Sequence, residues 1–110
     1  MSDEKTLDMN FLSLIMAHHQ AGLAHLGKVA DPMSGKVERN LEAVRGTIAV
    51  LESLERKTRG NLVREEEQAL QEAITFLRLN FVDEMKHVKE GEEPAAEAEE
   101  ASAAEETTGD

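Results

Sequence analysis

The feature that most constrains this chain is the run of residues 9–27, MNFLSLIMAHHQAGLAHLG, which contains no Asp, Glu, Lys or Arg. Apolar side chains recur through it without a proline, and this pattern predicts a helix over residues 7–26. Thr6 or Asp8 can cap its first backbone N–H groups, and Gly27 can adopt the left-handed conformation that ends a helix. A membrane span needs about 20 predominantly apolar residues, and the histidines and other polar residues here argue against one.

The apolar side chains of this predicted helix cover most of its circumference instead of one stripe. One arc carries large residues, and a separate face carries small ones that would let two helices approach closely. Two neighbouring helices of the same chain cannot cover both faces, so we expect a homodimer or a higher even oligomer with this helix at its centre. The candidate interface residues are Phe11, Ile15, Ala17, Ala21, Leu23 and Ala24.

Two further amphipathic helices are predicted, over residues 37–59 and 63–88, and no segment has the alternation of a strand. The expected fold is therefore all-α, a three-helix hairpin or bundle protomer that is dimeric through the first helix. In the third helix Phe76, Leu79 and Val82 lie off the main apolar stripe, which indicates a second buried surface.

Two connections join the predicted helices. The first contains DPMSGK, where Asp31 and Pro32 begin a turn and Gly35 supplies a position with positive φ. It is either a structural turn or a loop that binds a partner. The second is a short corner at Gly60 and Asn61, where Asn61 is also a candidate cap for the third helix.

The charge of the chain is concentrated at its C-terminus. Residues 90–110 contain nine acidic residues, no basic residue and no large apolar one. Such a segment cannot bury enough surface to offset the entropy of ordering, so we expect one domain over residues 1–89 and a disordered acidic tail over 90–110. The tail either solvates the protein or docks on a basic partner. The N-terminus lacks the pattern of a signal peptide, and the expected compartment is the cytoplasm.

Few residues offer chemistry. The chain contains no Cys, Tyr or Trp. His18 and His25 share one helix face, but they are about 10.5 Å apart along the axis and cannot hold one metal within one chain. Across an antiparallel pair of these helices they could meet, so they are weak candidates for a zinc site or a pH-sensitive contact, the other interpretation being ordinary interface histidines. Glu84 and His87 have the spacing of one di-iron ligand pair, without the second pair and the two further carboxylates that such a site needs.

A basic cluster of Arg56, Lys57, Arg59 and Arg64 surrounds the corner, where it complements a helix end or, less favourably, contacts nucleic acid or phosphate. No phosphate-binding glycine loop or nucleophile motif is present in the sequence. We therefore expect neither an enzyme nor a bound cofactor. The expected function is a non-enzymatic helical oligomer that acts as an interaction or regulatory module, with itself and an unidentified protein as partners. The alternatives are a histidine-based metal or pH sensor and, more weakly, a nucleic-acid or phosphate-binding regulator.

The loop Asp31-Pro32-x-Ser34-Gly35-Lys36 and the corner Lys57-Thr58-x-Gly60-Asn61-Leu62, followed by the EEE run and FLRLNFVDEM, carry a family resemblance. Over roughly residues 11–84 the chain resembles a bacterial family known only as domain of unknown function 1844. The resemblance implies a small, mostly helical, bacterial and cytosolic protein, and it brings no functional residue with it. The chain departs from the family pattern at Val63 and Arg64, where a Thr or Ser cap usually precedes the acidic run.

Overall fold

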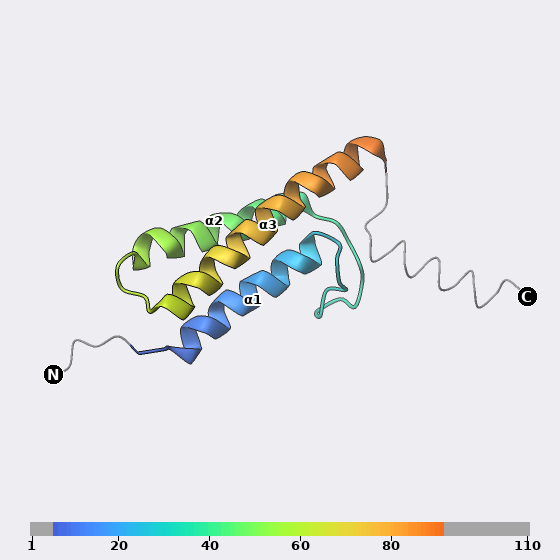
Figure 1. Cartoon of the computed structure of the whole chain (residues 1–110). Helices are drawn as coiled ribbons and strands as arrows, with labels where there is room; N and C mark the ends of the chain where they lie inside the picture. The colour runs from blue at the N-terminus through green and yellow to red at the C-terminus, as the bar shows by residue number, and fades with distance from the viewer. Residues whose placement is uncertain (1–5, 92–110) are drawn as a thin grey trace, which may run out of the picture.

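A computed structural model describes residues 6–91, which form a bundle of three helices without strands. The helices are α1 (Met9–His25), α2 (Leu41–Thr58) and α3 (Arg64–Glu90). Each helix packs against the other two, and α1 runs parallel to α3 while α2 runs antiparallel to both (Figure 1). The predicted all-α, three-helix architecture is confirmed.

Helix α1 begins and ends where local chemistry predicts. The Asp8 carboxylate accepts hydrogen bonds from the backbone N–H groups of Asn10 and Phe11, at 2.9 and 3.2 Å, so Asp8 and not Thr6 is the cap. The chain leaves the helix through Gly27, whose φ of 79° is strained for residues with a side chain. The observed helix is a residue or two shorter at each end than the predicted 7–26.

Helix α2 starts four residues later than predicted, at Leu41 instead of residue 37. Its cap is Asn40, whose side-chain oxygen accepts from the Ala43 N–H at 3.1 Å. The Asn40 N–H donates to the carbonyl of His25 at 2.7 Å, which ties the end of the connecting loop to the end of α1. Because the loop must cross between the two helices, residues 37–40 are used in the crossing and cannot begin α2.

Helix α3 begins at Arg64 without a capping side chain at Asn61 or Val63. The carboxylate of Glu66 substitutes for one: it accepts from the Val63 N–H at 2.9 Å and from the Asp8 N–H at 2.7 Å. One buried carboxylate therefore fixes the starts of both α3 and α1, which lie side by side. The helix continues to Glu90, two residues past the predicted end, and stops at Gly91 with φ 75°.

The core lies along the axis between the three helices. Gly22 of α1 allows the closest approach, because a Cβ added there would lie 2.5 Å from a methyl carbon of Leu77 in α3. The buried apolar residues around this contact are Ile15, Leu26, Val44, Ile48, Leu51, Leu70, Ala73, Ile74 and Leu77.

None of the helices described within residues 6–91 is both long enough and apolar enough to cross a bilayer. Residues 1–5 and 92–110 lie outside the described part of the chain, and they include most of the predicted acidic tail.

Candidate functional site

A shallow apolar groove follows the outer side of α1, next to α3. The groove residues are Met9, Leu12, Ser13, Met16, Ala17 and Gln20 of α1, with Ala69 of α3. Met9 and Met16 are 65% and 51% exposed, which is high for large apolar side chains on a helix. The groove residues include no charged side chain, so a partner would bind there mainly through the burial of apolar surface.

The apolar surface continues onto α3. The Phe76 ring packs edge to face against the His19 ring of α1, with centroids 5.2 Å apart, and part of Phe76 remains in solvent. One turn further, Leu79 is 67% exposed. Val82 is also exposed, but it lies on another side of α3, because six residues separate it from Phe76. These three residues were predicted to need a second buried surface, and within residues 6–91 Phe76 is covered only in part while Leu79 and Val82 stay more than half exposed. An exposed apolar patch larger than those usual on a monomeric protein is typical of a contact with another molecule.

The predicted interface residues of α1 fall in three places. Ile15 and Ala24 are buried inside the protomer, where they are not available to a second copy. Phe11, Ala21 and Leu23 are half-buried, and Ala17 alone is exposed and lines the groove. Sequence reasoning missed the other groove residues of α1. Their spacing, alternating between one and three residues, was a usable signal, because it places them on one side of a helix.

The weak metal candidates His18 and His25 are both half-buried on α1. The Nδ1 atom of His18 lies 3.0 Å from the carbonyl oxygen of Leu14, one turn earlier in the same helix. Among residues 6–91, neither histidine belongs to a group of three side chains that could hold a metal ion.

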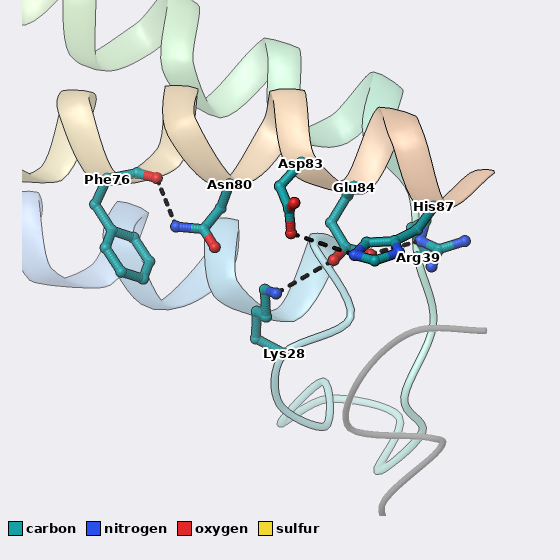
Figure 2. Close-up of polar contacts among 7 residues, drawn as sticks. All are labelled: Lys28, Arg39, Phe76, Asn80, Asp83, Glu84 and His87. Carbon is teal, nitrogen blue, oxygen red and sulfur yellow. Dashed lines mark hydrogen bonds and ion pairs between the residues drawn. The ribbon is translucent and has the colours of Figure 1, made fainter. Parts of the chain in front are cut away.

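One such group does occur, on α3, and consists of Asp83, Glu84 and His87 (Figure 2). The His87 Nε2 and an Asp83 carboxylate oxygen are 3.3 Å apart. Glu84 is only 1% exposed, and its two oxygens are contacted by the Lys28 Nζ at 3.2 Å and the Arg39 Nε at 2.9 Å. A divalent cation would have to displace two cations from this carboxylate, so the cluster fits ion pairing and not metal binding.

The Glu84 cluster has a structural consequence. Lys28 and Arg39 lie at the two ends of the loop between α1 and α2, so one buried carboxylate of α3 holds both ends of the loop. The sequence showed Glu84 only as half of one ligand pair, in a site that lacks its second pair. Its actual partners are 56 and 45 residues away in the chain, and no local pattern identifies them.

The predicted loop and corner residues form ordered turns. The Asp31 carboxylate accepts from the Met33 N–H at 2.7 Å, its carbonyl accepts from the Gly35 N–H at 2.7 Å, and Gly35 has the predicted positive φ, 72°. Pro32 lies exposed in this turn. At the corner Gly60 has φ 81°, and the Asn61 N–H donates to the carbonyl of Thr58. The basic residues around the corner, Arg56, Lys57, Arg59 and Arg64, are all exposed.

A family profile described as Domain of unknown function (DUF1844) matches residues 8–84 of this chain. The chain belongs to this family. The DUF1844 match begins at the cap of α1 and ends at Glu84, so it covers the groove, the loop, the corner and the buried carboxylates of Glu66 and Glu84. Comparisons with curated proteins and with solved structures give no match.

Proposed function

We propose that this DUF1844 protein is a non-enzymatic helical module that works by association, and that its apolar groove on α1 binds a second copy of the chain. The observation that supports the proposal is the groove itself, an uncharged strip on α1 flanked by exposed apolar residues of α3. Water contact with such a surface is unfavourable, and association removes it.

The energy available is substantial. Fully burying a methionine or leucine side chain is worth about 1.5–3 kcal/mol. Met9, Met16 and Leu79 each keep half or more of their surface in water in the protomer, so each retains a comparable fraction of that gain. A stable interface buries about 800 Å² on each partner, which requires α3 residues beside the α1 groove as well as the groove.

The two buried carboxylates of the described bundle support a binding role over a catalytic one. Glu66 accepts from two backbone N–H groups, and Glu84 is held between Lys28 and Arg39. Both are used in holding helices and loop together. General acid–base catalysis needs a titratable group within reach of a substrate, and the groove residues provide none.

The test is the mass of the full chain in solution, measured by light scattering over a range of concentrations. We expect a dimer for the natural sequence and a monomer for Met16→Glu, because the interface would have to bury two carboxylates that have no counter-charge in the groove. Val50→Glu is the matched control, since Val50 is 42% exposed on α2 and does not line the groove. A natural chain that stays monomeric at every concentration, or a Met16→Glu variant that stays dimeric, contradicts the proposal.

A further inference from the structure

The order of residues along the groove determines how two copies fit. The six groove positions of α1, residues 9, 12, 13, 16, 17 and 20, have the same spacing when read from either end. We propose that two copies pair through antiparallel α1 helices about a two-fold axis that crosses α1 between Leu14 and Ile15. This inference rests on the proposed self-association and adds its direction and register.

In this register each large groove residue meets a smaller or more adaptable one. Ser13 faces the partner's Met16, Leu12 faces the partner's Ala17, and Met9 faces the partner's Gln20. All six positions are used, and each contact occurs twice, as an isologous interface requires. A parallel pair would instead place Met16 against the partner's Met16 and Ser13 against the partner's Ser13, which crowds one level and leaves a gap at the other.

The charges on the α3 side of the groove also favour an antiparallel pair of α1 helices. At the N-terminal end of α1 lie Asp8 and, from the first turn of α3, Glu65. Glu65 shares a face of α3 with the groove residue Ala69, because it precedes Ala69 by one helical turn. Arg64 lies with Glu67 and Gln68 along another face of α3.

At the other end of α1 the charges are balanced. Lys28 and Arg39 contact Glu84, and Asp83 lies beside His87. A parallel pair would bring the two acidic ends together, and like charges in proximity oppose association. An antiparallel pair places each acidic end beside a balanced end. The dipoles of the two α1 helices also favour the antiparallel pair, because dipoles that lie side by side attract each other when they point in opposite directions.

The absence of cysteine from the chain makes a disulfide test clean. In the proposed arrangement positions 9 and 20 of opposite subunits are adjacent, whereas two copies of position 9 are roughly 16 Å apart along the axis, from the rise of 1.5 Å per residue. A disulfide requires Cα atoms closer than about 7 Å. We therefore expect an equimolar mixture of full-length Met9→Cys and Gln20→Cys chains to form a mixed disulfide dimer under mild oxidation, and neither variant alone to do so.

Three other outcomes overturn the inference, and they are distinguishable. Cross-linking of either variant alone indicates a parallel pair. Mixed chains that remain dimeric by light scattering under reducing conditions, but cross-link no faster than Met33→Cys, indicate another register or face. Met33 serves as the control because it is almost fully exposed in the loop and does not line the groove. If the reduced variants and the natural chain are all monomeric, that result contradicts the proposed self-association itself.

Discussion

Replacing Glu84 with glutamine removes one negative charge from a site where two positive charges converge. Glu84 is 1% exposed, Arg39 is 12% exposed and Lys28 is 24% exposed. Glutamine has nearly the same shape, so the change tests the charge and not the packing. The Arg39 guanidinium has little access to water and loses the charge that its Nε contacts, whereas the Lys28 ammonium can turn toward solvent.

The magnitude follows from these differences in burial. Breaking a buried ion pair by removing one partner costs about 3–5 kcal/mol, and a hydrogen bond to a charged group contributes about 1.5–3 kcal/mol. Because Lys28 retains access to water, we place the cost at the low end, about 3 kcal/mol. For a domain of this size that lowers the melting temperature by roughly 12–24 °C.

The assay is thermal and urea unfolding followed by the helical circular dichroism signal, at one fixed protein concentration because association also stabilises a protein. Glu72→Gln is the matched control, since Glu72 is exposed on the same helix and accepts a hydrogen bond from the Gln68 side chain at 3.1 Å. We expect that control to stay within about 0.5 kcal/mol of the natural chain. Equal stability of the Glu84→Gln and Glu72→Gln variants would refute the reasoning.

Three further substitutions test the bundle by the same unfolding assay. Gly46→Ala should stabilise the protein by about 0.5–1 kcal/mol, because Gly46 is inside α2 and its added Cβ meets no atom within 4 Å; a loss of stability would contradict this. Gly22→Ala should destabilise by about 1 kcal/mol net, because its Cβ would lie 2.5 Å from buried Leu77, and overpacking of about 1–3 kcal/mol outweighs the gain in helix propensity; a gain would show that Leu77 moves aside freely. Asp8→Ala should cost about 1 kcal/mol through the lost cap, and an unchanged midpoint would show that the start of α1 does not depend on it.

Features set by neighbouring residues were predictable from the sequence. The cap at Asp8, the stops at Gly27 and Gly60 and the positive φ of Gly35 each depend on a side chain, or its absence, within a few residues. Such interactions are local, so the amino-acid order specifies them whatever the rest of the chain does.

Features set by distant residues were not predictable. The Glu66 carboxylate, which accepts from the nearby Val63 N–H, also accepts from the Asp8 N–H, 58 residues away, and no local pattern indicates that second contact. Residues 37–40 have a helical pattern, but the crossing to α2 requires them, and the Asn40 N–H bonds to His25 instead. Glu84 likewise became a structural anchor only when both ends of the loop reached it.

The sequence by itself determined that the run over residues 9–27 is a helix with more apolar surface than one stripe can hold. Only the tertiary structure decided which part of that surface stays free. Periodicity places residues on faces of a helix, but the paths of α2, α3 and the loop decide which face is covered. They buried Ile15 and Ala24 and left Met16 and Ala17 in the open groove.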